Sequence, residues 1–379
     1  MKSLMDETGP VAVFCGHMFS EGSDEEAGLA ARVGEVLDRH GIGIAYGPLA
    51  CGADIVIAEQ VLARGGELNV VLPFAEEDFI AESVACGGPG WVARYHACRD
   101  AAARVSFATP GAYVGDDHQF AYNTRLAMGL AVLRADALGV PAIQLAIVSE
   151  QIHSLSRTGL AGAHADIRQW EKLSRQTEVI AAGPVPRKLK FPPRAPVGGG
   201  TRREIRSIIF ADYKGFSRLG ERELVQFMAE VMGRIGAVLD EFGDHVEFRN
   251  TWGDAVYAIV DEPTVAARLA LAMQDRLADL PPELTPPGDQ AGMRIGVHYG
   301  PVWVGTDRIT GNRIWYGGEV NRTARIEPVT PVGGVYCTET FAAALTIDNC
   351  TECKFRSVGV QALAKSFGEV ELYELEMPR

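Results

Sequence analysis

Residues 208–217, with the sequence IIFADYKGFS, decide the fold of the C-terminal half of the chain. The apolar run predicts a buried strand that ends at Asp212, followed by a tight turn through Gly215. Residues 250–260, NTWGDAVYAIV, predict a hairpin with a second acid, Asp254, at its tip. Two carboxylates at the ends of neighbouring strands are suited to hold divalent metal ions against a polyphosphate.

The segments around these two stretches predict a ferredoxin-like α+β domain over residues 204–379, with an antiparallel sheet and helices on one face. Apolar residues recur at helical spacing over 221–242, which indicates a core-facing helix. The other expected elements are strand 205–212, hairpin 246–260, helix 263–280, a second hairpin made of MRIGVHYG and PVWVGTD, helix 319–328, and strands 334–338, 354–360 and 369–375.

Residues 1–182 show a different rhythm, in which apolar strands alternate with helices. Continuous Val, Ile and Leu runs with helices between them predict a parallel sheet that is covered on both faces, as in Rossmann-like domains. The expected strands are 11–19, 42–46, 67–74, 104–111, 142–148 and 177–182, and the expected helices are 25–39, 53–64 and 119–138.

Residues 183–203, GPVPRKLKFPPRAPVGGGTRR, separate the two halves. Five prolines, a glycine triplet and six basic residues cannot bury a core. We therefore expect a linker here.

Composition narrows the class of protein. A chain of 379 residues with 47% hydrophobic content is expected to form about two globular domains. Its formal net charge of −13 argues against general nucleic-acid binding, which needs a basic face. No apolar run approaches the ~20 residues of a membrane span, and no signal peptide is evident. Seven cysteines, including the pair Cys350 and Cys353, are expected to be reduced thiols in a cytoplasmic protein.

The order YGPLACGAD, helix, ARGGELNVVLPF resembles the SLOG superfamily over roughly residues 10–150. Members of that Rossmann-like group bind nucleotides or nucleotide-derived ligands. The PGGxGTxxE signature of its phosphoribohydrolases is missing, so the resemblance implies ligand sensing or a structural role. The expected ligand contacts are Gly16, Gly47, Gly52 and Asp54. Alternatively, these glycines only form tight turns between strands and helices.

Five motifs of the C-terminal half resemble class III nucleotidyl cyclases, the group of adenylate and guanylate cyclases. They are FADYKGFS, NTWGDAVYAIV, RIGVHYGPVWVG, YGGEVNRTAR and ALAKSFGEVELYEL, in that order. The resemblance implies conversion of a nucleoside triphosphate to a 3′,5′-cyclic nucleotide and pyrophosphate. It also implies two Mg²⁺ or Mn²⁺ ions per site, held by Asp212 and Asp254.

The same resemblance assigns three further residues. Asn321 is expected to orient the ribose, and Arg325 to stabilise charge at the α-phosphate. Lys365 corresponds to a lysine on the β- and γ-phosphates, although Ser366 replaces the glycine that usually follows. Because in the family the metal residues and the Asn/Arg pair meet only across a subunit interface, a two-fold homodimer with composite active sites is implied.

The base-reading positions depart from both purine codes. Adenylate cyclases usually have Lys and Asp, and guanylate cyclases Glu and Cys, where this chain has Asn250 and Ile314. The Asn250 amide can donate and accept, so it suits uracil, cytosine or a purine edge. Nearby aromatic residues either narrow the pocket or only pack; the candidate substrate contacts among them are Trp252, Tyr316 and Phe216.

A small pocket with an Asn reader resembles the bacterial pyrimidine cyclases of anti-phage signalling, which make cyclic UMP or cyclic CMP. Two alternatives stay open. The domain is an adenylate or guanylate cyclase of ordinary signal transduction, or it is a catalytically silent nucleotide-binding sensor. An active cyclase also requires a cyclic-nucleotide receptor on another chain.

Overall fold

The computed structural model describes residues 9–22, 25–149, 162–183, 189–192, 202–284 and 292–378. The chain divides into two compact units, Met1–Gly198 and Gly199–Arg379. The expected linker, residues 183–203, lies mostly outside the described residues. Among the described residues no helix is long and apolar enough to cross a membrane. All seven cysteines are free thiols.

The first unit contains a six-stranded parallel sheet in the order β4-β3-β2-β1-β5-β6. This confirms the expected Rossmann-like architecture. The strands are β1 (Val11–Gly16), β2 (Ile44–Gly47), β3 (Glu67–Leu72), β4 (Arg104–Phe107), β5 (Ala142–Val148) and β6 (Thr177–Ala181). The helices are α1 (Glu25–His40), α2 (Ala53–Ala63), α3 (Glu76–Phe79), α4 (Pro89–Ala101), α5 (His118–Leu138) and α6 (Ala163–Glu171).

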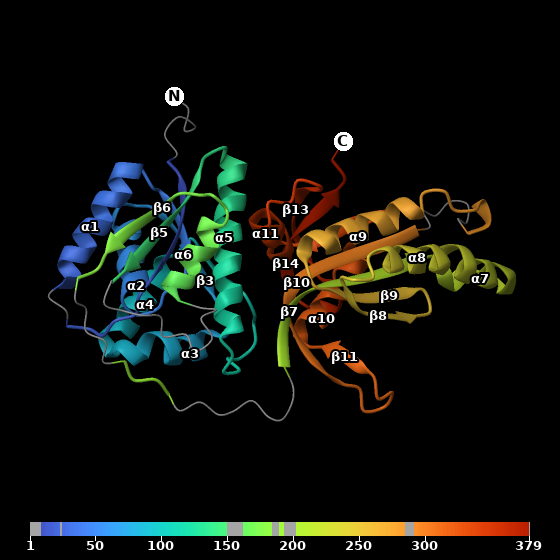
Figure 1. Ribbon diagram of the computed structural model, residues 1–379, viewed down its shortest axis with the longest axis horizontal. Helices are drawn as coiled ribbons and strands as arrows, with labels where there is room; N and C mark the ends of the chain where they lie inside the picture. The colour runs from blue at the N-terminus through green and yellow to red at the C-terminus, as the bar shows by residue number, and fades with distance from the viewer. Residues whose placement is uncertain are drawn as a thin grey trace. The chain divides into compact units, whose positions relative to one another are not determined.

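Helices cover both faces of this sheet, and α1 and α5 lie on opposite sides of it (Figure 1). The direction of strand addition reverses between β1 and β5, because β2, β3 and β4 follow on one side and β5 and β6 on the other. In open α/β sheets this reversal opens a crevice at the carboxyl ends of the two strands.

The second unit is built on a ferredoxin-like core, as expected. Its central strands are ordered β10-β7-β9-β8 and all pair antiparallel, while β12, β14 and β13 extend the sheet. The strands are β7 (Arg202–Lys214), β8 (Val246–Trp252), β9 (Ala255–Val260), β10 (Gly292–Thr306), β11 (Arg313–Tyr316), β12 (Val335–Thr338), β13 (Lys354–Ala362) and β14 (Glu369–Glu376). The helices are α7 (Glu221–Phe227), α8 (Gly233–Glu241), α9 (Pro263–Arg276), α10 (Gly318–Thr323) and α11 (Glu339–Ile347).

The two faces of this sheet differ. One face packs against α8, α9 and α11 through buried residues such as Ile209 and Tyr213 of β7. The other face carries an aromatic cluster that includes Phe210, Phe248 and Trp315, and Val320 of α10 packs against it. Figure 1 shows α9 and α10 on opposite sides of the sheet. The expectation of helices on one face only is therefore wrong for α10.

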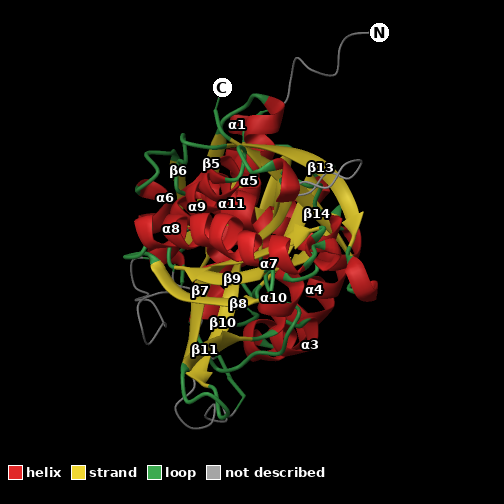
Figure 2. Cartoon of the chain, turned by 90° about the vertical axis from the view of Figure 1, so that its right-hand side faces the viewer, coloured by secondary structure: helices red, strands yellow, loops and turns green. Residues whose placement is uncertain are grey.

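The expected hairpin between MRIGVHYG and PVWVGTD is also wrong, because both segments form the single strand β10. Proline lacks an N–H group and normally interrupts pairing. Here β12 pairs with β10 only up to Val297, and β11 pairs with it only from Trp303. Pro301 lies in this gap between the described partner strands. The turn comes later, and β11 folds back on the end of β10, away from the region covered by α8 and α9 (Figure 2).

Candidate active site

Asp212 and Asp254 lie together at one end of the β7–β9 pair. Asp212 is near the end of β7, and Asp254 occupies the turn between β8 and β9, one residue before β9 begins. Ala211 of β7 is paired with Val256 of β9. Asp212 follows Ala211 and Asp254 precedes Val256 by two residues, so both acids lie at the same end of this strand pair. Burial raises the pKa of Asp254, and the nearby carboxylate of Asp212 raises it further. The two strand-end acids are therefore close enough to repel each other.

Arg294 and Glu327 complete this group. Arg294 of β10 is directly opposite Asp212 in the β7–β10 register, and its Nη2 lies 2.6 Å from Asp212 Oδ2. The same nitrogen lies 2.6 Å from Oε1 of Glu327, which is 9% exposed. Burial, followed by repulsion from Asp212, raises the pKa of Glu327 to about 7. Neither Arg294 nor Glu327 was predicted from the sequence.

The donor set fits divalent metal ions. Two carboxyl groups contact one guanidinium and a third lies nearby, so the group has an excess of negative charge when all three are ionised. Carboxylate oxygens are the ligands that Mg²⁺ and Mn²⁺ prefer. Asp212 and Asp254 would hold such ions, because they lie together at the end of the β7–β9 pair.

The residues expected at ribose and phosphate come from α10, the segment just after it, and the turn before β14. Asn321 is exposed on α10, and Arg325 is half-buried just after it. Lys365 is exposed in a turn before β14, with a left-handed backbone at φ 59°. Within the described residues, none of these three side chains forms a hydrogen bond or ion pair with Asp212 or Asp254.

The expected base-reading residues lie on β8 and β11. Asn250 is exposed and accepts a hydrogen bond from its neighbour's backbone N–H at 2.9 Å. Tyr257 is paired with Asn250 across the β8–β9 ladder, and its hydroxyl donates to the carbonyl of Trp315 at 2.9 Å. Trp315 is the neighbour of Ile314, which is half-buried on β11. Tyr257 thereby connects the strands of the two base-reading positions.

The three aromatic candidates differ in exposure. Trp252, at the end of β8, is 89% exposed, and Tyr316, at the end of β11, is 40% exposed. Phe216 is half-buried and its ring centroid lies 4.9 Å from that of Phe227. It also faces the hairpin tip, since a Cβ on Gly253 would be 3.7 Å from its ring. Phe216 thus packs beside Asp254, whereas Trp252 and Tyr316 are largely open to solvent.

In the first unit, two of the four expected ligand contacts have a packing role. A Cβ at Gly16 would be 2.2 Å from that of Ala53, and one at Gly47 would be 2.5 Å from the Phe14 ring. Both glycines therefore allow close approach of apolar groups.

The other two expected contacts lie at the start of α2. Gly52 precedes the helix with φ 97°, a conformation that glycine adopts without strain. Asp54 is 4% exposed, and its Oδ2 accepts a hydrogen bond from the Ala50 N–H at 3.2 Å. Burial raises the pKa of Asp54 well above its ordinary value. It is the one polar side chain among the four expected contacts.

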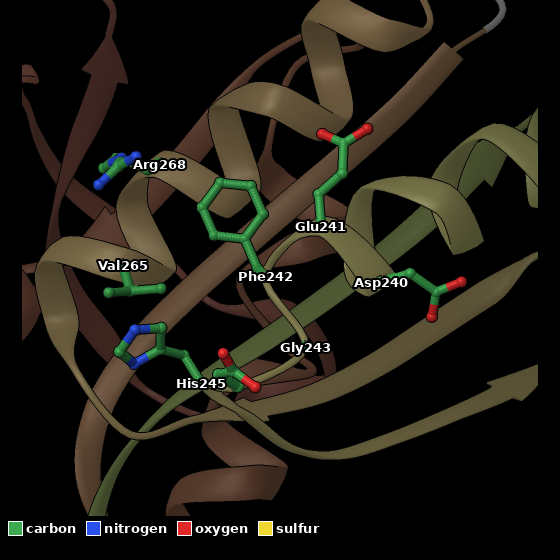
Figure 3. Close-up of a pocket in the computed structure, with 8 residues that line it drawn as sticks. Asp240, Glu241, Phe242, Gly243, His245, Val265 and Arg268 are labelled. Carbon is green, nitrogen blue, oxygen red and sulfur yellow. The ribbon is translucent and has the colours of Figure 1, made fainter.

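A cavity of about 550 Å³ lies at the opposite end of the β8–β9 hairpin from Asp254. It is lined by the end of α8, the following turn and the first turns of α9 (Figure 3). Most of its charged groups are already paired, as Asp240 is with Arg249 and His245 with Asp261. The cavity is therefore distinct from the acidic group at Asp212.

Comparison with known proteins finds a family match in the second unit. Residues 201–376 match the family model of the adenylate and guanylate cyclase catalytic domain. No curated protein matches the chain.

Several solved structures are similar to the chain. The adenylyl cyclase CyaB from P. aeruginosa is 18% identical, with 48% of this chain and 97% of that chain covered and a TM-score of 0.41. The guanylate cyclase domain of RhGC from Catenaria anguillulae, in complex with GTP, is 18% identical, with 47% and 100% covered and a TM-score of 0.40. The non-canonical dimeric guanylyl cyclase domain of RhoGC from Blastocladiella emersonii is 18% identical, with 48% and 100% covered and a TM-score of 0.39. By the family match, residues 201–376 are similar to the catalytic domain of adenylate and guanylate cyclases.

Proposed function

We propose that the protein cyclises a pyrimidine nucleoside triphosphate, UTP or CTP, to a 3′,5′-cyclic nucleotide and pyrophosphate. The observation that supports the cyclase reaction is the pairing of Asp212 and Asp254 at one strand end, with Arg294 beside them. Phosphoryl transfer depends on positioning and charge neutralisation more than on covalent chemistry. An acidic group with one adjacent arginine provides those elements.

Each side chain has a separate task in this proposal. Asp212 and Asp254 hold Mg²⁺ or Mn²⁺, which supplies Lewis-acid activation of the 3′-hydroxyl and neutralisation of the phosphates. Asn321 orients the ribose, and Arg325 donates to the α-phosphate as charge develops there. Lys365 binds the β- and γ-phosphates. Its exposed ammonium is suited to a mobile, negatively charged leaving group.

The proposal requires a homodimer, which brings these residues together in one active site. In the family that this unit resembles, the metal residues and the Asn/Arg pair meet across a subunit interface, so in this proposal a second copy supplies Asn321 and Arg325. A two-fold dimer places the metal residues of each copy opposite the Asn321 and Arg325 of the other and gives two equivalent sites. Trp252 lies beside the acid pair and is 89% exposed, so it is available for burial by that second copy.

The pyrimidine preference rests on the base-reading positions. The Asn250 side chain offers an amide donor group and an acceptor, whereas Ile314 offers neither. The two positions can therefore form hydrogen bonds with one edge of a base only. The side chains of Trp252 and Tyr316 lie at the ends of the same two strands, and in this proposal they close over the base and leave less room for a purine. A cyclic pyrimidine nucleotide would act as a second messenger on a receptor of another chain, as in anti-phage signalling.

We propose a regulatory ligand site for the first unit, as in SLOG-like sensors. Its position would be the carboxyl edge of β1 and β5, where strand addition reverses. Asp54 is the candidate ligand contact because it is buried and polar at that edge. Asp54→Asn should change the response of cyclase activity to added nucleotides without abolishing basal turnover.

One assay tests the proposed reaction and its substrate. The purified full-length chain is incubated with Mn²⁺ and, separately, with ATP, GTP, CTP or UTP, and products are identified by chromatography and mass. We expect pyrophosphate and cyclic UMP or cyclic CMP, with no product in EDTA. Faster turnover of ATP or GTP would replace the pyrimidine assignment with a purine cyclase. No product from any of the four would leave a silent nucleotide-binding sensor.

A further inference from the structure

A buried histidine–glutamate contact lies beneath the helix that carries Asn321. His298 of β10 is 2% exposed and Glu319 of α10 is 5% exposed. The Nε2 of His298 lies 2.9 Å from Oε2 of Glu319. Isolated buried charges are costly, so a histidine–glutamate pair kept inside a small domain needs a compensating role.

The pair is held from both sides. On the strand side, Nδ1 of His298 lies 2.9 Å from the hydroxyl of Thr338 and 3.2 Å from that of Thr340. On the helix side, Oε2 of Glu319 lies 3.1 Å from Nε of Arg322, one turn further along α10. The network therefore runs from β12 through His298 into the helix.

The protonation states follow from burial and charge. Burial holds the pKa of His298 below its ordinary value, although Glu319 favours its charged form. Burial alone would raise the pKa of Glu319, but His298 and Arg322 outweigh it and the pKa is lowered. The pKa directions favour a neutral imidazole beside an ionised carboxylate, with the two threonine hydroxyls grouped around Nδ1.

The backbone of β10 makes room for this contact. A Cβ at Gly300 would be 2.7 Å from Nε2 of His298 and 3.2 Å from Cγ of Glu319. A Cβ at Gly296, on the same face, would be 3.0 Å from the Glu327 backbone nitrogen. The face of β10 therefore alternates a polar side chain with glycine, which lets the segment from α10 to Glu327 approach closely.

The helix depends on tertiary contacts for its position. α10 has six residues, and Gly317 before it provides no side-chain cap. Val320 contributes one apolar contact to the aromatic cluster. Such a short helix is not stable by itself and depends on tertiary contacts.

We propose that His298 and Glu319 are positioning residues for catalysis, which fix α10 and thereby set the placement of Asn321 and Arg325 in the active site. This inference rests on the proposed roles of Asn321 and Arg325. Neither His298 nor Glu319 touches substrate. Misplacement of a catalytic group by about 1 Å can cost ~10²-fold in rate, so the pair should affect kcat strongly.

The kinetic test uses graded substitutions of Glu319 in the full-length chain. Glu319→Ala should lower kcat about 10²-fold, with KM changed less than threefold. Glu319→Gln keeps an acceptor for His298 and should recover about half of that loss on a logarithmic scale. Glu204→Gln is the matched control, because Glu204 is 6% exposed and lies 2.9 Å from Arg206. Glu204→Gln should leave kcat within about threefold of the wild-type value.

Mixing of chains shows which half of the site is affected. A mixture of Asp212→Ala and Asn321→Ala chains should regain about a quarter of wild-type activity, because half of the dimers are mixed and each has one intact site. Glu319→Ala should likewise be rescued by Asp212→Ala chains and not by Asn321→Ala chains. Rescue by Asn321→Ala chains instead, or by neither, would overturn the proposal.

Hydrogen exchange provides a readout that does not need turnover. Glu319→Ala should speed amide exchange in residues 318–325 and leave residues 208–217 unchanged, as measured by mass spectrometry on the full-length chain. Unchanged exchange in 318–325 would refute the anchoring role, even if the wild-type chain showed no cyclase activity. A silent wild-type chain with faster exchange in the variant would refute the proposed reaction alone.

Discussion

The guanidinium of Arg294 lies 2.6 Å from the carboxylate of Asp212, its directly opposite neighbour on the adjacent strand. It is the positive charge shared by Asp212 and Glu327, and Asp254 adds a third acid to the group. A metal ion and Arg294 therefore neutralise the same carboxylates.

Arg294→Gln should destabilise the metal-free protein and make its stability depend on added metal. Removal of the cation leaves the acids to repel one another, which we expect to cost about 1–2 kcal/mol after allowance for partial exposure. Thermal melting of the full-length chain should show a lower Tm that Mn²⁺ restores more than in wild type. Arg276→Gln, at an exposed pair with Glu241, is the control. Equal Tm values for wild type and Arg294→Gln in the absence of metal would contradict this prediction.

Asp212→Asn and Asp254→Asn should each lower turnover by at least ~10²-fold, because an amide is a poorer ligand for hard divalent ions. The loss should appear in initial rates at saturating Mn²⁺. Asp240→Asn removes an exposed acid that is paired with Arg249, and should leave the rate unchanged. If Asp212→Asn or Asp254→Asn retained activity, the substituted residue would not be a metal ligand.

Asn250→Lys combined with Ile314→Asp should shift substrate preference towards ATP. The double variant restores the charged pair with which adenylate cyclases usually read adenine. Buried polar readers discriminate bases by several kcal/mol, so the ratio of kcat/KM for ATP over UTP should rise at least tenfold. An unchanged ratio would mean that other residues read the base.

Asp166→Asn should stabilise the first unit above neutral pH. Asp166 of α6 is 8% exposed, and burial raises its pKa to about 7, although Thr124 and Arg168 lower it. The fold favours the protonated form, so this contribution is fully present below pH 3.8 and is lost as pH rises through about 7. The full difference is at most about 4 kcal/mol.

Calorimetry of the full-length chain from pH 5 to pH 8 checks this prediction. The wild-type transition of the first unit should fall in temperature as pH rises, and the transition of Asp166→Asn should fall less. Parallel curves for the two proteins would show that Asp166 is already charged in the fold at pH 5.

Much of the second unit could be predicted from local pattern. The hairpin 246–260 combines strand-forming residues with a Gly253 turn, and the structure shows it as β8 and β9. That pattern alone puts Asp254 at the tip. Arg294 could not be found in this way, since its contact with Asp212 depends on register between strands 82 residues apart.

Some helices were missed because their sequences lack helical periodicity. α11 is buried on nearly all sides, so apolar residues fill it without a polar face. The hairpin expected between MRIGVHYG and PVWVGTD could not be distinguished from one strand by local pattern. The strand continues through Pro301 because its missing N–H faces the gap between β12 and β11.

Arg294 and His298 lie on the same face of β10, four residues and about 13 Å apart. In a two-fold dimer with composite sites, Arg294 belongs to one active site, while His298, through Glu319, belongs to the other. The strand between them pairs with β7 from Gly292 to Val304 and cannot lengthen. A nucleotide that moves Arg294 at the first site would therefore shift α10 at the second. We expect the two sites to bind substrate cooperatively, with a saturation curve that departs from a hyperbola.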